Sequence, residues 1–276
     1  MIVTADDFGL APEVNQAVEQ AHRNGILSAA SLMVGARASP DAVARARRMP
    51  SLRVGLHLVL TDGAPILARD RIPDLVNGAG SLRTDMVKAG VDIFLRPSVR
   101  RQMRAEIEAQ FAAFRETGLQ LDHVNSHHHF HLHPTVGAEL LRVGVENGMR
   151  GVRVPREPRR LLRQIEPGTK TVFDPITVPW AALLQSRVRY RGLRAPDRVF
   201  GLTWSGAMTQ PRLLGILNNL PEGAIEIYLH PATSNAFPEA KSGYRYADEL
   251  AALTSPAVMA ALRASGAQLS GFADLR

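Results

Sequence analysis

The chain has 276 residues, of which 45% are hydrophobic and 21% charged, and its formal net charge is +7 at pH 7. This composition is typical of a globular protein with ample core material, and the lack of cysteine excludes disulfides, zinc–thiolate sites and cysteine nucleophiles. No apolar stretch approaches the roughly 20 residues that span a bilayer, and the N-terminus does not resemble a signal peptide. We therefore expect a cytoplasmic protein.

Short apolar runs alternate with helical patterns along the chain. We expect strands at residues 2–5, 28–34, 54–60, 120–125, 151–154 and 224–229. We expect helices at residues 12–24, 41–48, 98–117, 134–147 and 247–254. Such alternation implies parallel strands joined by right-handed crossovers. The sequence therefore predicts an α/β fold with one domain over residues 1–276, a distorted (β/α) TIM-like barrel.

Residues 155–200 interrupt this alternation, being rich in proline, arginine and large apolar residues. We interpret the segment as an insertion or lid on the site face, with an amphipathic helix at about 180–190. Its apolar side chains could pack the lid onto the barrel, bind a lipid or rest on an anionic membrane. Two arginine clusters lie in this part of the chain: Arg153, Arg156, Arg159, Arg160 and Arg163, then Arg187, Arg189, Arg191, Arg194 and Arg198.

These arginines could form an ordinary solvated surface or attract a polyanion such as anionic lipid. No helix-turn-helix, zinc-finger or aromatic-interleaved motif accompanies the charge, so we expect no nucleic-acid partner.

Acidic residues and histidines follow several of the predicted strands. Six of the nine histidines fall within His123–His133, in the run DHVNSHHHFHLHP. The other strand ends carry Asp6, Asp7, His57 and His230. Because the carboxyl ends of parallel strands build one rim, we expect carboxylates and imidazoles to meet there. Such groups are ligands for divalent transition metals.

Each residue taken alone also has a purely structural interpretation. One of the two adjacent acids could cap the helix that starts near residue 12, and His57 could be a buried histidine bonded to a backbone carbonyl. His127 and His129 would share one side of an extended segment, with His128 pointing away from them. A mononuclear zinc site takes about three protein ligands and water, so not all six histidines of the run can be ligands.

Four motifs together, TADDFG, GLHLVLT, NSHHHFHLHP and LHPA, resemble those of the YdjC-like carbohydrate deacetylases, from about Met1 to the C-terminus. VRVPREP and NSHHHFHLHP resemble more narrowly the deacetylases associated with hopanoid biosynthesis. The resemblance implies a metal-dependent N-deacetylase with a distorted (β/α) barrel of the glycoside hydrolase/deacetylase type. It also implies a substrate, an N-acetylglucosaminyl group on a hopanoid glycolipid (N-acetylglucosaminyl bacteriohopanetetrol).

Carried over by motif, the resemblance assigns roles to five residues. Asp7, His57 and His127 would hold one divalent metal ion, zinc in preference to magnesium or another divalent ion. Asp6 would be the general base, and His230 the general acid.

Three further residues would line the pocket or support the ligands. His129 is the expected pocket neighbour. Many relatives have aspartate where this chain has Asn125, and an amide would give a ligand weaker hydrogen-bonding support. Asp122, three residues earlier, could substitute for that acid.

Two other functions remain open at this point. One is a deacetylase of soluble N-acetylated chitooligosaccharide, which would need an open, polar groove. The other is a non-enzymatic, histidine-rich metal-binding protein, with several ions held mainly within His127–His133. For partners we expect an N-acetylated glycolipid or sugar, peripheral contact with the inner face of an anionic membrane, and a homodimer.

Overall fold

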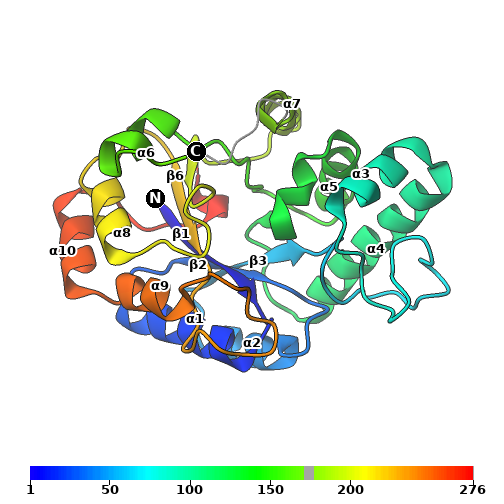
Figure 1. Ribbon diagram of the computed structural model, residues 1–276, viewed down its shortest axis with the longest axis horizontal. Helices are drawn as coiled ribbons and strands as arrows, with labels where there is room; N and C mark the ends of the chain where they lie inside the picture. Colours follow the sequence, from blue (N-terminus) through cyan, green and yellow to red (C-terminus); the bar gives the residue numbers. More distant parts are fainter. Residues whose placement is uncertain (171–176, 276) are drawn as a thin grey trace.

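A parallel, curled sheet forms the centre of the molecule, and the helices lie around its outside (Figure 1). The computed structural model describes residues 1–170 and 177–275. The six strands are paired in the order β4-β3-β2-β1-β6-β5. They are β1 (Ile2–Phe8), β2 (Ala29–Leu32), β3 (Arg53–Leu58), β4 (Val124–Ser126), β5 (Arg198–Phe200) and β6 (Ile225–Leu229).

The helices from α1 to α8 lie between successive strands, and α9 and α10 follow the last strand. They are α1 (Pro12–Asn24), α2 (Ser39–Arg47), α3 (Met86–Leu95), α4 (Pro97–Glu116), α5 (Pro134–Glu146), α6 (Arg159–Ile165), α7 (Thr177–Tyr190), α8 (Gln210–Leu217), α9 (Tyr246–Leu253) and α10 (Pro256–Ala264), with short 3-10 turns η1 (His127–Leu132) and η2 (Phe272–Asp274). Six of them have proline in the first two positions, where the missing N–H costs no helical hydrogen bond. No helix within the described residues is long and apolar enough to cross a membrane.

The predicted α/β fold with parallel strands is confirmed, but the sheet is a six-stranded half-barrel rather than a complete TIM barrel. The segment predicted as a strand at residues 151–154 runs between the two edges. Val124 N donates to Gly151 O on one side, and Val152 N donates to Arg194 O on the other. These contacts are isolated bridges, so this segment spans the gap between the edges without a continuous ladder.

The segment predicted as an insertion, residues 155–200, contains α6, α7 and the edge strand β5. The helix expected at 180–190 corresponds to the C-terminal part of α7, which packs against α5 and η1. Residues 171–176 of this segment lie outside the described residues. Sequence patterns did not predict α3, α6, α8 or α10.

Alternate residues of the strands divide the sheet into an apolar and a polar side. In β1, Val3 and Ala5 belong to the main hydrophobic core. Thr4 and Asp6, which alternate with them, are equally buried but hydrogen-bond to Glu226 and other polar groups. Because successive side chains of a strand point to opposite faces, this alternation collects polar groups on one side of the curled sheet. The candidate site lies at the carboxyl edge of this polar side.

Candidate metal centre

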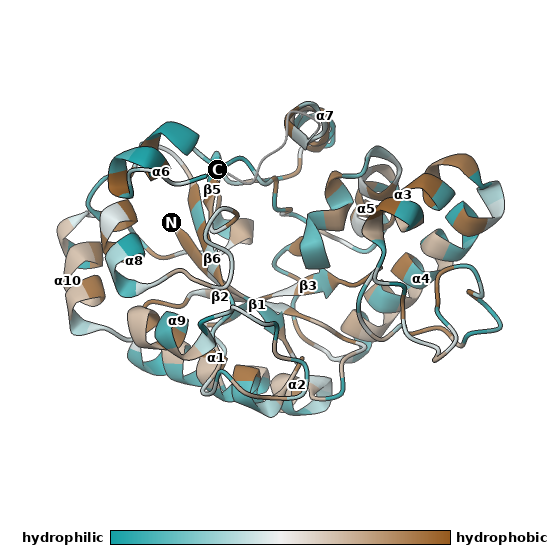
Figure 2. Ribbon diagram, in the orientation of Figure 1, coloured by the Kyte–Doolittle hydropathy of each residue, from teal (hydrophilic) through white to brown (hydrophobic). Residues whose placement is uncertain are grey.

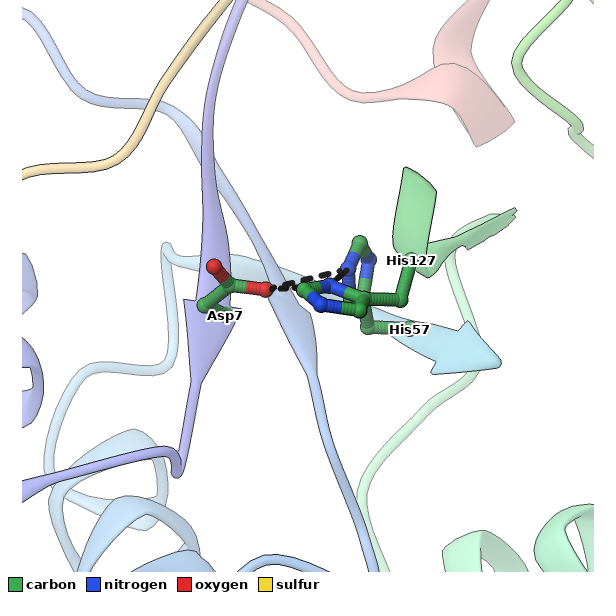
Figure 3. A group of neighbouring side chains, drawn as sticks. All are labelled: Asp7, His57 and His127. Atoms are coloured by element: carbon green, nitrogen blue, oxygen red, sulfur yellow. Dashed lines mark hydrogen bonds and ion pairs between the residues drawn. The ribbon is translucent and has the colours of Figure 1, made fainter. Parts of the chain in front are cut away.

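Three side chains from three different strand ends converge to form a compact cluster (Figure 3). Asp7 Oδ1 lies 3.0 Å from His127 Nδ1 and 3.2 Å from His57 Nε2. The two ring nitrogens are 3.3 Å apart. All three residues are buried. The structure therefore brings together the three residues that the sequence predicted as metal ligands.

A local irregularity at the end of β1 allows both adjacent acids to reach the site. The pairing of β1 with β2 shifts between Ala5 and Phe8, and Asp7 adopts a left-handed backbone conformation with φ of 60°. Such a bulge re-aims a side chain that would otherwise alternate to the other face. Neither acid caps the following helix, because its N-cap Ala11 makes no side-chain hydrogen bond. The bend thus falls at Asp7 itself, inside the strand.

Left-handed backbone outside glycine is concentrated at this site. Among the described residues, only Asp7, Asp62, His128 and His129 combine a side chain with a positive φ. Asp62 Oδ2 lies 3.7 Å from His128 Nε2. Each such conformation costs about 1–3 kcal/mol and persists only where the surrounding structure holds it. The surrounding fold therefore stabilises strained backbone conformations around this cluster.

Asn125 connects the predicted ligand His57 to the predicted base Asp6. Its Oδ1 accepts a hydrogen bond from His57 Nδ1 at 2.7 Å, which leaves His57 Nε2 facing Asp7. Its Nδ2 donates to Asp6 Oδ1 and to Ser31 Oγ, both at 2.9 Å. A carboxylate at this position would have no N–H to donate to Asp6. The Asn125 amide can therefore accept a hydrogen bond from His57 and donate one to Asp6 at the same time.

Asp122 lies away from the cluster and reaches it only through other residues. His123 Nδ1 donates to Asp122 at 2.9 Å, and His123 Nε2 accepts from Ser31 Oγ at 3.0 Å. Ser31 in turn accepts from Asn125. The Asp122 carboxylate also accepts from the backbone N–H of Phe272, near the C-terminus. Asp122 therefore does not replace an acid at position 125; it anchors the far end of a buried hydrogen-bond chain.

A buried arginine lies beneath the cluster. Arg153 is completely buried and donates to both oxygens of Asp6, at 2.5 and 3.0 Å, and to Glu226, at 2.6 and 3.0 Å. Burial by itself would raise the pKa of Asp6, but the charge of Arg153 holds that pKa well below its usual value. The guanidinium also lies 4.3 Å from the centre of the Tyr228 ring. Arg153 therefore belongs to the interior, not to the surface cluster in which the sequence had placed it.

Most histidines of the run have other hydrogen-bond partners. The run forms the kinked turn η1 rather than an extended segment, so the expected alternation of His128 and His129 does not occur. His129 Nε2 and the Tyr228 hydroxyl are hydrogen-bonded at 2.9 Å. His131 accepts from Ser126 Oγ at 2.6 Å and donates to a backbone carbonyl at 2.9 Å. These rings support the site instead of forming an array of ligands.

His230 follows β6 and lies at the wall of the site. Its backbone N–H donates to the buried carboxylate of Glu249 at 2.5 Å, and burial raises the pKa of Glu249 to about 7. The His230 ring lies against Tyr228 and Tyr244, and its Nδ1 has no hydrogen-bond partner in the described part of the chain. Burial lowers the pKa of His230, although Asp7 and Asp6 oppose this effect. A buried ring nitrogen without a partner is available to a substrate group.

A cavity of about 310 Å³ opens beside the cluster. Its polar lining includes Asp6, His57, His127, His129 and His230. Its larger apolar and aromatic lining residues are Met86, Leu132, Leu202, Tyr228 and Tyr244. The predicted base and acid therefore line the same space as two of the predicted ligands. Such a concave site with a few convergent polar groups is the usual form of a small-molecule site.

Lys241 lines both this cavity and a second one. Its ammonium lies 3.2 Å from His127 Nε2 and 2.6 Å from His128 Nε2. Burial, together with neighbouring His127 and Lys241, lowers the pKa of His128 to about 3, so this ring accepts the hydrogen bond. The second cavity, of about 460 Å³, is lined by His127, Lys241, Asp62 and others.

Sequence reasoning missed four residues of this region: Arg153, Glu226, Tyr228 and Lys241. Glu226 and Tyr228 alternate with apolar residues in IEIYL, a run that had been interpreted only as a strand. A glutamate inside a buried apolar strand needs a positively charged partner, so the sequence could have predicted a buried cation opposite Glu226. No local pattern marks Lys241, which lies in a loop before α9.

Comparison with known proteins identifies the family of the chain. Residues 1–264 match the family described as YdjC-like protein. The chain belongs to this family. It is 30% identical to a carbohydrate deacetylase of Geobacillus stearothermophilus over 97% of this chain and 94% of that protein. A carbohydrate deacetylase of Brevibacillus brevis is 40% identical over 146 residues, which are 53% of this chain and 56% of that protein.

A solved structure shares the fold along the whole chain. It is an Enterococcus faecalis V583 protein described as a cellobiose-phosphate cleavage protein, with a TM-score of 0.77 and 25% identity. The superposition covers 98% of this chain and 96% of that protein. The half-barrel is therefore the fold of a full-length relative.

Proposed function

We propose that this protein removes the acetyl group from an N-acetylated amino sugar with the help of one divalent metal ion. The broader prediction, that the chain is an enzyme and a carbohydrate deacetylase, is confirmed by its full-length similarity to curated carbohydrate deacetylases. This likeness opposes the alternative of a non-enzymatic histidine-rich protein. The observation that carries the metal proposal is the buried cluster of Asp7, His57 and His127 beside a cavity that contains Asp6 and His230.

The donor set fits a divalent cation. One carboxylate and two imidazoles converge within 4.8 Å of one another. The hydrogen bond of His57 Nδ1 to Asn125 directs the other ring nitrogen to the cluster, as expected for a histidine ligand oriented by a second residue. Burial would lower the pKa of His57, but the charges of Asp6 and Asp7 raise it, so the site favours positive charge here. Two imidazoles with one carboxylate suit zinc better than magnesium.

Two further side chains would move protons. When bound, the cation supplies Lewis acidity, which polarises a carbonyl and lowers the pKa of water. Arg153 keeps Asp6 ionised, so this carboxylate can accept a proton from the water that attacks the acetyl carbon. His230 would enter the reaction as the imidazolium, a form that the charges of Asp7 and Asp6 favour against the effect of burial. It would then donate its proton to the sugar nitrogen as the C–N bond breaks, because an amine anion is a very poor leaving group. Both residues line the cavity.

For the substrate we favour N-acetylglucosamine on a hopanoid glycolipid. The motifs VRVPREP and NSHHHFHLHP carry this resemblance. The apolar lining of the cavity at Met86, Leu132 and Leu202 supports a substrate with an apolar body. One observation favours soluble chitooligosaccharide instead: the second cavity, which shares His127 and Lys241, could receive a second sugar ring. Acetate release from N-acetylglucosaminyl bacteriohopanetetrol and from N,N′-diacetylchitobiose would separate the two.

The roles of the two adjacent acids can be tested directly. We expect Asp6→Asn to retain one equivalent of metal by elemental analysis and to lose acetate release by roughly 10²–10⁴-fold, the usual contribution of a general base. Asp7→Asn should lose both the metal and the activity, because it removes a charged ligand. Asp41→Asn, at the start of α2, is the matched control and should change neither measurement. Full activity in Asp6→Asn would contradict its role as base, and full metal content in Asp7→Asn would contradict the metal site.

A further inference from the structure

Helix α3 carries an apolar face that nothing covers in the described part of the chain. Five exposed large apolar residues lie in this ten-residue helix, from 36% to 79% exposed: Met86, Val87, Val91, Phe94 and Leu95. Val87, Val91, Phe94 and Leu95 recur at i, i+4, i+7 and i+8, which is the spacing of one helix face. The apolar colour of this helix is visible in Figure 2.

The opposite face of α3 holds the helix to the protein. Ala89, Gly90 and Ile93 are buried, and the helix packs against α4 and α5. The helix is therefore apolar on two sides, of which only one is needed for folding. Monomeric proteins rarely expose contiguous apolar patches of this kind unless the patch contacts a protein or a membrane.

The first residue of α3 reaches the catalytic cavity. Met86, the first residue of α3, lines that cavity, as does Thr177 at the start of α7. The Phe94 ring lies 6.4 Å from the ring of His133, which lies 5.8 Å from Trp180 of α7. The N-termini of both helices therefore border the cavity, and a surface that covers α3 would lie close to it.

The charges around this face indicate what covers it. Residues 83–104 contain six basic residues and two acidic ones. Three of the arginines are paired with carboxylates: Arg83 with Asp92, Arg96 with Asp74 and Arg104 with Glu139. Lys88 and Arg101 are exposed, and neither forms an ion pair within the described residues. A second copy of the chain docked on the same face would bring like charges together. Anionic lipid headgroups would complement them, and the acyl region would receive the apolar side chains.

We propose that α3 rests on an anionic membrane surface with Val87, Val91 and Phe94 inserted, so that the cavity mouth faces the bilayer. The purpose that we give to this placement rests on the proposed function: the enzyme would reach the sugar of a membrane glycolipid without extracting its lipid. Lipid binding itself is independent of catalysis.

Flotation of the full-length protein with lipid vesicles tests the proposal. We expect the wild type to float with vesicles of equal parts phosphatidylcholine and phosphatidylglycerol at low salt, and much less with phosphatidylcholine alone. In the variant Val87→Ser/Val91→Ser/Phe94→Ser the bound fraction should fall by about tenfold or more, because three apolar side chains no longer enter the bilayer. The variant Val145→Ser/Leu269→Ser removes exposed apolar residues elsewhere and should float as the wild type does.

Several outcomes would overturn the proposal. They are a wild type that does not float with anionic vesicles, a triple variant that floats equally well, and a control variant that loses binding to the same extent. A wild-type dimer that becomes monomeric in the triple variant, with no vesicle binding by either, would assign the face to self-association. Acetate release from a water-soluble N-acetylated sugar distinguishes failure of the membrane proposal from failure of the proposed function. We expect equal acetate release by the wild type and the triple variant. If neither protein released acetate, the deacetylase proposal alone would be rejected.

Discussion

The interior beneath the metal cluster and the outer face of α3 distribute polar and apolar side chains in opposite ways. The interior holds the buried charges of Arg153, Asp6 and Glu226. The surface of α3 exposes Val87 at 79% and Phe94 at 59%. Folding alone favours neither arrangement, because charges lose hydration when buried and apolar groups are hydrated when exposed. The difference teaches that the buried charges depend on partners within the chain, whereas the exposed apolar face has no such partner within the described residues, which is why we propose a membrane for it.

Removal of the buried cation should have the largest effect. Arg153→Met leaves Asp6 and Glu226 buried without a positive partner, so the free energy of unfolding should fall by about 3–5 kcal/mol. Urea denaturation measures this change, and acetate release should be lost with it. Arg160→Met removes an exposed arginine of the same sequence cluster and should stay within about 0.5 kcal/mol of the wild type. Equal losses in the two variants would place Arg153 outside the network.

A change from amide to acid should have an intermediate effect. Asn125→Asp keeps the size of the side chain but removes the N–H groups that donate to Asp6 and Ser31. We expect a loss of about 1–3 kcal/mol in the free energy of unfolding, from an unpaired acceptor that faces a second carboxylate. The measurement is urea denaturation together with acetate release, which should also fall. A more active Asn125→Asp protein would show that the acid expected from the family resemblance is the better partner of His57.

Changes to the outer face of α3 should have the smallest effect on folding. The variant Val87→Ser/Val91→Ser/Phe94→Ser should unfold within about 0.5 kcal/mol per substitution of the wild type, since exposed side chains away from special features contribute little. Ile93→Ala, on the buried face of the same helix, should cost about 2–5 kcal/mol. Thermal and urea denaturation of both proteins provide the comparison. A large loss in the triple variant would mean that its outer face also packs within the fold.

The metal cluster could be located from the sequence because each predicted ligand lies at or near the end of a strand. Parallel strands place these ends on one edge, so the acids and histidines there could be assigned to one site without knowledge of the strand order. The choice of Asp7, His57 and His127 as ligands came from the resemblance of the motifs to a known family. The backbone conformation around these residues could not be predicted from the sequence. The left-handed turn at Asp7 and the kink at His128 depend on tertiary contacts and leave no pattern in a single sequence.

The buried network illustrates a second limit. Arg153 and Glu226 are 73 positions apart, and their contact exists because β6 pairs with β1 while residues 151–154 run beside β4. Arg153 appeared in the sequence as one member of an arginine-rich surface. Only the strand order makes it the partner of Asp6.

The sequence by itself determined the α/β class, the approximate positions of the main strands and several helices, and the residues able to hold a metal ion. The fold class and the elements follow from local periodicity and from the common direction of parallel strands. The choice of the metal-binding residues follows from the resemblance of the four motifs to a known family. The tertiary structure decided the half-barrel, the pairing of Arg153 with Asp6, and which face of α3 is exposed. In each case the reason is the same: a local pattern states that a residue is polar or apolar, but only the packed fold states which group lies against it.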